Sequence, residues 1–352
     1  MNQIEIDGRC IGPDHSPYVI AEVSANHNGK LETAIRIIEE AKKAGADAVK
    51  LQTYKPDTIT LNSDKEDFKI RGGLWDGRTL YDLYEEAHMP WDWHKPLFTH
   101  ARRLGITIFS SPFDSTAIDL LEDLNAPAYK IASFEAVDLP LIKYAASTGK
   151  PMIISTGMAD AEEIQEAIDA AREGGCKDLA VLHCVSGYPA PAEDYNLRTI
   201  SDMIDRYGLV TGLSDHTLEN TTAITSVAMG ASLIEKHFTL DRSGGGPDDS
   251  FSLEPADFAA LCQGVHTAWK ALGRVDYGRK ASEKGNVQFR RSLYFTKALP
   301  KGTRIQAGDI QSVRPGYGLP PKYTGQVIGR TLTREVAAAT PVLPCDLKDM
   351  PS

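Results

Sequence analysis

Two stretches of the sequence decide the fold: Gly212-Leu213-Ser214-Asp215-His216-Thr217 and Leu233-Ile234-Glu235-Lys236-His237-Phe238. In each of them a histidine follows a short apolar run and precedes a loop or a helix. This pattern places His216 and His237 at the carboxyl ends of consecutive parallel strands, where a β/α barrel keeps its active site. Two imidazoles that converge there form a partial metal site, with coordination positions left open for substrate and water. Two unrelated histidines hydrogen-bonded in a core would give the same spacing.

Eight runs of strand-forming residues lie along the chain, and nearly every run is followed by a helical pattern. The runs are 18–23, 48–52, 106–110, 128–132, 152–155, 179–184, 209–213 and 232–237. The helical patterns are clearest over 31–44 and 161–171, where apolar residues recur every three or four positions. Eight strand–helix units predict a (β/α)8 TIM barrel of the α/β class over residues 1–272. The alternative, a doubly wound open sheet, usually has a glycine-rich phosphate loop after its first strand, and none is visible.

Two regions depart from this alternation. Roughly residues 54 to 92 form a long connection rich in aromatic side chains, which predicts a lid or a substrate wall on the catalytic face. Residues 273–289 are polar and contain glycine, as is typical of a linker. Residues 290–352 offer short strands and few helix formers, and they predict a small β-rich domain with little core of its own.

Composition excludes several classes of protein. The formal net charge of -10 argues against a surface that binds nucleic acid or an anionic membrane. No apolar run is long enough to span a bilayer, and no signal peptide is visible. The five cysteines form no close pair and their number is odd, which suits reduced thiols. We therefore expect a cytoplasmic protein without nucleic-acid or membrane partners.

Polar side chains recur where the apolar strands finish. Lys50 and Gln52 alternate along one strand, so both point to the same face. Lysines within apolar strands are rarely buried without an anion. Lys50 and Lys130 therefore predict either internal ion pairs with Glu22 or Glu135, or a ligand that carries phosphate and carboxylate groups. A Schiff-base aldolase, which also uses a barrel lysine, is a second interpretation. The hydroxyl groups at strand ends belong to Ser110, Ser133, Ser155 and Ser214.

Long motifs in a fixed order resemble those of the sialic acid synthase family. They are Ile20-Ala21-Glu22, Asn26-His27-Asn28-Gly29, residues 44–53, Ser111-Pro112-Phe113-Asp114, Ser155-Thr156-Gly157-Met158, residues 212–217, residues 234–238 and Gly246-Pro247-Asp248. The tail, with Arg290-Arg291-Ser292-Leu293 and Arg314-Pro315-Gly316, is similar to the antifreeze-like (SAF) domain of that family. Within the family, Gly73-Leu74-Trp75-Asp76-Gly77 and residues 250–255 most resemble pseudaminic acid synthases. N-acetylneuraminate and legionaminate synthases are the alternatives.

The resemblance implies an aldol-like condensation. C3 of phosphoenolpyruvate attacks the aldehyde of an open-chain amino sugar, water adds at C2, and phosphate leaves by C–O cleavage. For a pseudaminic acid synthase the sugar is 2,4-diacetamido-2,4,6-trideoxy-β-L-altropyranose. A divalent metal cation, Mn²⁺ or Mg²⁺, is expected on His216 and His237. Glu22 and Glu135 are expected to be the general acid and base, in an order that the sequence leaves open.

The resemblance also distributes the remaining side chains over the two substrates. Those expected to hold the carboxylate of phosphoenolpyruvate are Lys50, Gln52 and Ser110. Those expected to hold its phosphate are Lys130, Ser133, Ser155 and Ser214. Tyr188 and Asp248 are expected to contact the sugar, although packing and loop capping would also explain them.

The last implication concerns assembly. In the family the tail of one subunit caps the barrel of its partner, so we expect a homodimer with a domain-swapped SAF domain. The arginine that matches Arg314 then reaches an acyl group of the sugar, whereas on sequence alone Arg314 is most simply a solvated surface charge. Non-enzymatic alternatives are a catalytically inactive sugar-phosphate binding protein and an ice-binding protein. An inactive relative should have lost a metal histidine or a phosphate lysine, and neither is missing here.

Overall fold

The computed structural model describes residues 3–350 and divides the chain into two compact units, Met1–Gly273 and Arg274–Ser352. The outermost residues of the two predicted domains, 1–2 and 351–352, lie outside the described residues.

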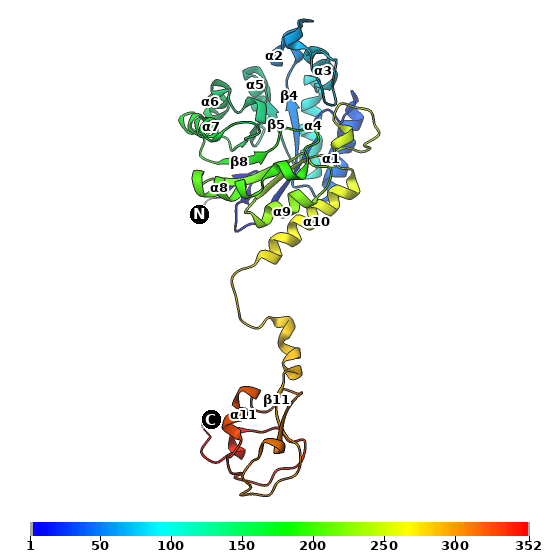
Figure 1. Ribbon diagram of the computed structural model, residues 1–352. Helices are drawn as coiled ribbons and strands as arrows, with labels where there is room; N and C mark the ends of the chain where they lie inside the picture. The colour runs from blue at the N-terminus through cyan, green and yellow to red at the C-terminus, as the bar shows by residue number, and fades with distance from the viewer. Residues whose placement is uncertain (1–2, 351–352) are drawn as a thin grey trace. The chain divides into compact units, whose positions relative to one another are not determined.

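The first unit is a closed barrel of parallel strands in the order β10-β3-β4-β5-β6-β7-β8-β9 (Figure 1). Its strands are β3 (Tyr18–Glu22), β4 (Ala48–Thr53), β5 (Thr107–Pro112), β6 (Tyr129–Ile131), β7 (Met152–Ser155), β8 (Leu179–Cys184), β9 (Val210–Asp215) and β10 (Leu233–His237). Each of the eight predicted runs overlaps one of these strands, with ends that agree within two residues. The predicted TIM barrel is confirmed.

Helices follow the strands and form the outer layer. They are α1 (Leu31–Ala44), α2 (Pro56–Ile59), α3 (Leu80–Ala87), α4 (Trp91–Leu104), α5 (Ser115–Asp123), α6 (Leu139–Ser147), α7 (Ala161–Glu173), α8 (Arg198–Tyr207), α9 (Thr221–Ala228) and α10 (Pro255–Leu272). Short 3-10 helices are η2 (Ser133–Glu135), η3 (Ala192–Tyr195) and η4 (Asp249–Phe251). The end signals explain where helices stop and start: Gly45 closes α1 in a left-handed conformation, and the Asp160 carboxylate accepts from the first backbone N–H groups of α7.

A short hairpin closes the amino-terminal end of the barrel. It consists of β1 (Ile4–Ile6) and β2 (Arg9–Ile11), which pair in antiparallel fashion. Three isoleucines of this hairpin pack with the inward-facing side chains at the start of the barrel strands. The hairpin was not predicted, because two three-residue strands carry too short an alternation to be distinguished from a loop.

Strand alternation decides which polar side chains enter the barrel. Leu233 of β10 belongs to the inner apolar cluster, whereas its neighbour Ile234 packs on the outer one. Glu235 and His237 therefore share the inner face with Leu233, since side chains on a strand alternate between its two faces. The same parity turns Lys50 and Gln52 inward on β4, next to β3 with its inward Glu22.

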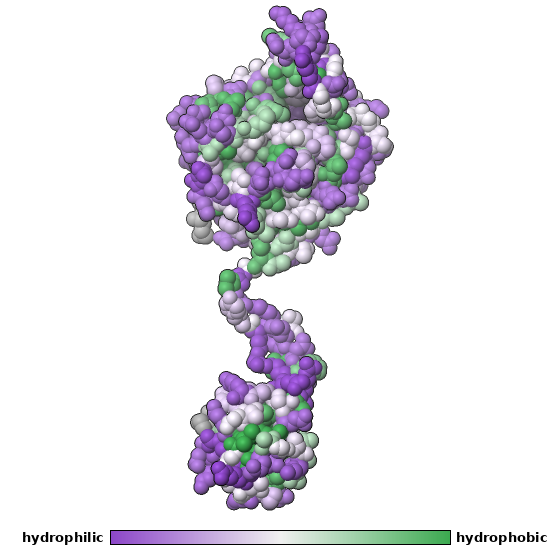
Figure 2. Space-filling model, viewed as in Figure 1, coloured by the Kyte–Doolittle hydropathy of each residue, from purple (hydrophilic) through white to green (hydrophobic). Residues whose placement is uncertain are grey.

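The predicted insertion after β4 contains α2, the 3-10 helix η1 (Glu66–Phe68) and α3. Figure 2 shows that its tip, beside α2 at the top of the view, is hydrophilic, in keeping with the exposed charged residues around η1. Within residues 3–350, no helix is long and apolar enough to cross a membrane.

The second unit pairs β11 (Ser292–Phe295) with β12 (Ile310–Val313) in antiparallel fashion. Its other elements are η5 (Ala281–Phe289), η6 (Ala307–Asp309), η7 (Pro321–Tyr323), α11 (Thr324–Val327) and η8 (Pro344–Asp346). The segment 273–289, predicted as a linker, contains η5 and falls mostly within this unit. The unit has a small apolar core of its own, centred on side chains such as Leu293, Phe295 and Val342.

Candidate functional site

A cavity of about 470 Å³ opens at the carboxyl ends of the barrel strands. All but three of the predicted site residues line it. Those that do are Glu22, Lys50, Gln52, Lys130, Ser133, Glu135, Tyr188, Ser214, His216, His237 and Asp248. These side chains come from six of the barrel strands and the loops that follow them.

Two buried lysines and two buried glutamates form the charged floor of this cavity. Lys50 Nζ lies 2.9 Å from Glu22 Oε2 and 3.0 Å from Glu235 Oε1, and Lys130 Nζ lies 3.0 Å from the same Glu235 oxygen. All four side chains are almost fully buried. The predicted pair between Lys50 and Glu22 is present, whereas Lys130 is paired with Glu235 and not with Glu135. Glu235 thus bridges both lysines.

The carboxyl groups of the site differ in their protonation. Burial raises the pKa of Glu22 to about 7, despite the opposing charge of Lys50. Burial likewise raises the pKa of Glu135 to about 7. For Glu235 burial acts in the same direction, but the charges of Lys130 and Lys50 outweigh it and lower the pKa to about 2. Glu235 is therefore a fixed anion, while Glu22 and Glu135 exchange protons near neutral pH.

The two histidines of the opening motifs lie face to edge, with ring centroids 5.4 Å apart. Burial lowers the pKa of His216 to about 4 and that of His237 well below its ordinary value, so both imidazoles are neutral. His216 Nδ1 lies 2.8 Å from the carbonyl oxygen of Val185, which leaves its other nitrogen as a lone-pair donor. His237 Nδ1 is buried and has no hydrogen-bond partner among the described residues.

These features fit a divalent cation with an incomplete protein shell. Neutral imidazoles are the protonation state that a metal requires. Across residues 3–350, no group of three or more His, Cys, Asp and Glu side chains is arranged to hold a metal. The two histidines would therefore be its protein ligands, and the open positions would remain for substrate and water.

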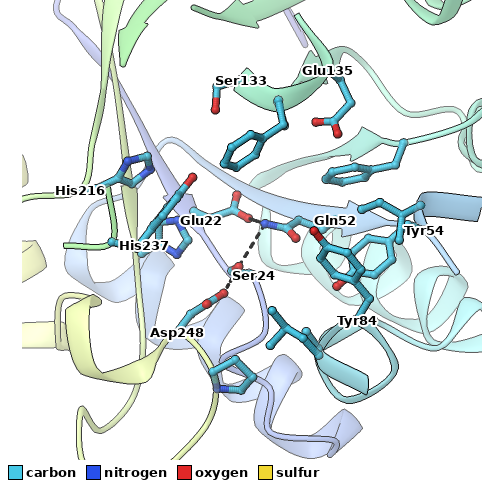
Figure 3. Close-up of a pocket in the computed structure, with 18 of the residues that line it drawn as sticks. Glu22, Ser24, Gln52, Tyr54, Tyr84, Ser133, Glu135, His216, His237 and Asp248 are labelled. Atoms are coloured by element: carbon cyan, nitrogen blue, oxygen red, sulfur yellow. Dashed lines mark hydrogen bonds between the residues drawn. The ribbon is translucent and has the colours of Figure 1, made fainter. Parts of the chain in front are cut away.

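Aromatic and small polar side chains build the other end of the cavity (Figure 3). The Tyr188 ring packs at a tilt against His216, with centroids 4.4 Å apart, and also lies 5.9 Å from the Trp75 ring. Trp75 comes from the insertion, and its indole N–H donates to the carbonyl oxygen of Pro247 at 3.1 Å. The Asp248 carboxylate accepts from the hydroxyl of Ser24. The insertion therefore forms a wall of this cavity, as the sequence predicted.

Three predicted residues lie elsewhere. Ser110 faces the helical layer, where its hydroxyl is 2.6 Å from Thr53 Oγ1, and it does not line the cavity. Its neighbour Ser111 faces inward instead and accepts from Lys50 Nζ at 3.4 Å. Ser155 points inward but does not line the cavity, and its buried hydroxyl has no hydrogen-bond partner within the described chain. Arg314 follows β12 in the second unit, and its contact with a sugar stays a prediction.

Glu235 and Ser24 are among the cavity-lining residues that sequence analysis missed. Glu235 lies two residues before His237 on the same strand, so strand parity alone would have found it. Ser24 stands in the loop after β3 and lines the cavity, but nothing in the sequence distinguishes it from an ordinary loop serine.

Comparisons with known proteins agree with this geometry. The NeuB family model matches residues 37–277, and the SAF domain model matches residues 290–348. The pseudaminic acid synthase of Campylobacter jejuni (strain 81-176) is 45% identical over 325 residues, which cover 92% of this chain and 94% of that protein. The N,N'-diacetyllegionaminic acid synthase of Legionella pneumophila is 35% identical over 339 residues, covering 94% and 95%. The crystal structure of N-acetylneuraminic acid synthetase from Leptospira borgpetersenii, in complex with citrate, superposes with a TM-score of 0.73 at 31% identity and covers 82% of this chain and 96% of that one.

Proposed function

Because this chain belongs to the NeuB family and ends in a SAF domain, we propose that it condenses phosphoenolpyruvate with 2,4-diacetamido-2,4,6-trideoxy-β-L-altropyranose and water. The products are pseudaminate and phosphate. The observation that carries this proposal is one cavity that combines a floor of two buried lysines with two neutral imidazoles. The higher identity to a pseudaminic acid synthase than to a legionaminic acid synthase supports the choice of sugar.

The lysines provide the anion site. Phosphoenolpyruvate carries a phosphate and a carboxylate, and Lys50 and Lys130 would each form a charge-assisted contact with one of them. Ser133 and Ser214, which border the cavity beside Lys130, add hydroxyl donors for the phosphate. Glu235 keeps both ammonium groups ionised and in place before the substrate arrives.

His216 and His237 would hold the divalent cation, Mn²⁺ or Mg²⁺. When bound, the cation supplies Lewis-acid polarisation of the aldehyde oxygen. The neutral state of both imidazoles and the unpartnered nitrogen of His237, judged over residues 3–350, support this assignment.

The reaction moves two protons before phosphate leaves. The aldehyde oxygen gains one as C3 of phosphoenolpyruvate forms the new C–C bond, and water loses one as it adds at C2. The bond between C2 and the phosphate oxygen then breaks, and the departing phosphate takes the proton of the C2 hydroxyl, so that C2 becomes a ketone. Glu22 and Glu135 would carry the first two protons, because a carboxyl with a pKa near 7 both gives and accepts a proton at neutral pH.

The sugar would occupy the aromatic end of the cavity. A trideoxy sugar with two acetamido groups presents methyl groups for Trp75 and Tyr188, and amides for a few polar groups such as Asp248. We further propose that the protein is a homodimer in which Arg314 of the partner subunit approaches an acyl group of this sugar. Burial of the small second domain against another subunit would add to its limited core.

The test is a comparison of two sugars. The purified protein is incubated with phosphoenolpyruvate, Mn²⁺ and either the altrose derivative or N-acetylmannosamine, and products are identified by mass spectrometry. We expect pseudaminate from the altrose derivative and little product from N-acetylmannosamine. In H₂¹⁸O the released phosphate should contain no ¹⁸O, because the C–O bond breaks. Product from N-acetylmannosamine alone would replace this assignment by the neuraminate reaction. Binding of phosphoenolpyruvate without product from either sugar would indicate an inactive binding protein.

A further inference from the structure

Ser24 adopts a backbone conformation that serine rarely takes. Its φ angle is 45°, in the left-handed region that favours glycine, and its side chain is buried beside the cavity. A residue with a Cβ is retained in this conformation only where the surroundings stabilise it. The hydrogen bonds of the Ser24 hydroxyl indicate why a serine occupies this position.

The Ser24 hydroxyl joins two parts of the site (Figure 3). Gln52 Nε2 donates one hydrogen bond to Glu22 Oε1 at 2.9 Å and a second to Ser24 Oγ at 3.0 Å. Ser24 Oγ in turn donates to Asp248 Oδ2. The Ser24 hydroxyl therefore both accepts and donates a hydrogen bond, and the two bonds point toward opposite ends of the cavity.

The direction of these bonds fixes two side chains. The Gln52 amide turns its NH₂ toward both Glu22 and Ser24, which places its donors where an ionised Glu22 accepts them. Asp248 Oδ2 is occupied by Ser24 and by the backbone N–H of Ala25 at 3.4 Å. Asp248 Oδ1 has no hydrogen-bond partner among residues 3–350, so it remains available to a sugar hydroxyl or amide.

We propose that Ser24 is a positioning residue that couples the phosphoenolpyruvate end of the cavity to its sugar end. It holds the Asp248 carboxylate in the orientation that receives the sugar, and it holds Gln52 against Glu22. This inference rests on the proposed function, in which Asp248 contacts the sugar and Glu22 transfers a proton. Asp248 also follows Pro247, whose carbonyl anchors Trp75 of the insertion, so the same short segment carries two walls of the sugar site.

The experiment compares Ser24→Ala and Ser24→Gly. Both remove the hydroxyl, but only glycine relieves the left-handed backbone conformation. We expect the KM for the sugar to rise about tenfold in both variants, as for the loss of one charge-assisted hydrogen bond. The KM for phosphoenolpyruvate should change less than twofold, because Gln52 keeps its hydrogen bond to Glu22. Ser24→Gly should unfold at a higher temperature than Ser24→Ala. Ser226→Ala is the matched control, since Ser226 is buried in α9 and its hydroxyl bonds only to a backbone carbonyl. This control should change neither KM.

Three outcomes would overturn the proposal: wild-type kinetics of Ser24→Gly, equal increases of both KM values, or strictly additive effects of Ser24→Ala and Asp248→Asn in a double-mutant cycle. A crystal structure of Ser24→Gly tests it without turnover. We expect Asp248 and Gln52 to lose their common orientation, and unchanged side-chain conformations would refute the role of Ser24. If the wild-type protein converts neither sugar, the proposed function fails. The positioning role of Ser24 is then tested by the crystal structure of Ser24→Gly alone.

Discussion

Glu235→Gln should destabilise the barrel far more than the loss of an exposed ion pair. Glu235 is the anion 3.0 Å from both Lys50 and Lys130, and its side chain is 4% exposed. Lys50 would keep Glu22, but Lys130 has no second carboxylate within ion-pair distance in the described chain. Removing one partner of a buried pair costs about 3–5 kcal/mol, because an unpaired charge remains buried. At roughly 2 °C per kcal/mol for a domain of this size, the unfolding midpoint should fall by roughly 6–10 °C.

The assay is thermal unfolding of the ligand-free protein, with Glu173→Gln as the matched control. Glu173 pairs with Lys143 at 2.7 Å, but its side chain is 66% exposed. Such a pair contributes little, so the control should lose at most about 2 °C. The folded-state pKa of Glu235, about 2, lies below the ordinary value of 4.5. Its stabilising contribution is therefore complete above pH 4.5 and disappears as the pH falls toward 2. The gap between Glu235→Gln and wild type should therefore narrow as the pH falls from 4.5 toward 2.

A midpoint for Glu235→Gln within 2 °C of the Glu173→Gln control would refute this reasoning. It would mean that Lys130 loses its proton or reaches water when Glu235 is neutral. A gap that does not narrow as the pH falls below 4.5 would also contradict it, because the ionised form of Glu235 would then contribute no stability.

Three further predictions address the chemistry and the assembly. His237→Ala should lower the affinity for Mn²⁺, measured by calorimetry, by at least about tenfold and leave little activity, because one of two imidazole ligands is lost; unchanged Mn²⁺ binding would exclude the site. Lys130→Ala should raise the KM for phosphoenolpyruvate roughly tenfold or more and that for the sugar much less, as for a lost charge-assisted contact; equal KM values in variant and wild type would remove Lys130 from the anion site. The His237→Ala and Arg314→Ala variants should each be inactive, but a mixture of the two should recover part of the activity, because a heterodimer would contain one intact hybrid site. Sedimentation and differential tags would show whether heterodimers form. Heterodimers that form without recovering activity would exclude a shared site.

The barrel was predictable because its signal is repeated. Eight apolar runs each followed by a helical pattern leave few alternatives, and caps such as Asp160 mark the boundaries. The site followed from the same pattern, since parallel strands bring their carboxyl ends to one face. Single positions were less certain. The predicted run ended at Ser110, whereas β5 continues to Pro112, and a shift of one residue reverses the face of a side chain. Register with β4 pairs Ser111 with Gln52, so the neighbouring strand would have selected Ser111.

Contacts between distant segments were beyond the sequence. Lys130 needed an anion, but the nearest candidate along the chain, Glu135, was not its partner. Glu235 became the partner because β10 and β6 direct their inner side chains into the same barrel interior. The conformation of Ser24 was equally hidden, since a serine gives no sign of a left-handed backbone.

The charges of the floor also order the roles of the two titrating glutamates. With Glu22 ionised, Lys50 and Lys130 are balanced by Glu22 and Glu235, and no net positive charge remains for an anionic substrate. The phosphate of phosphoenolpyruvate alone brings a charge of about -1.5 to -2 at pH 7, so its binding favours protonated Glu22, whose pKa is already near 7. We therefore propose that Glu22 would enter the reaction as the acid and that Glu135 would be the base. At pH 8 phosphoenolpyruvate should therefore bind with uptake of a proton, measured by calorimetry in buffers of different ionisation enthalpy. Its affinity should decrease as the pH rises above 7. Glu22→Gln should abolish the uptake, whereas Glu135→Gln should preserve it. Uptake that persists in Glu22→Gln would assign the acid to another group.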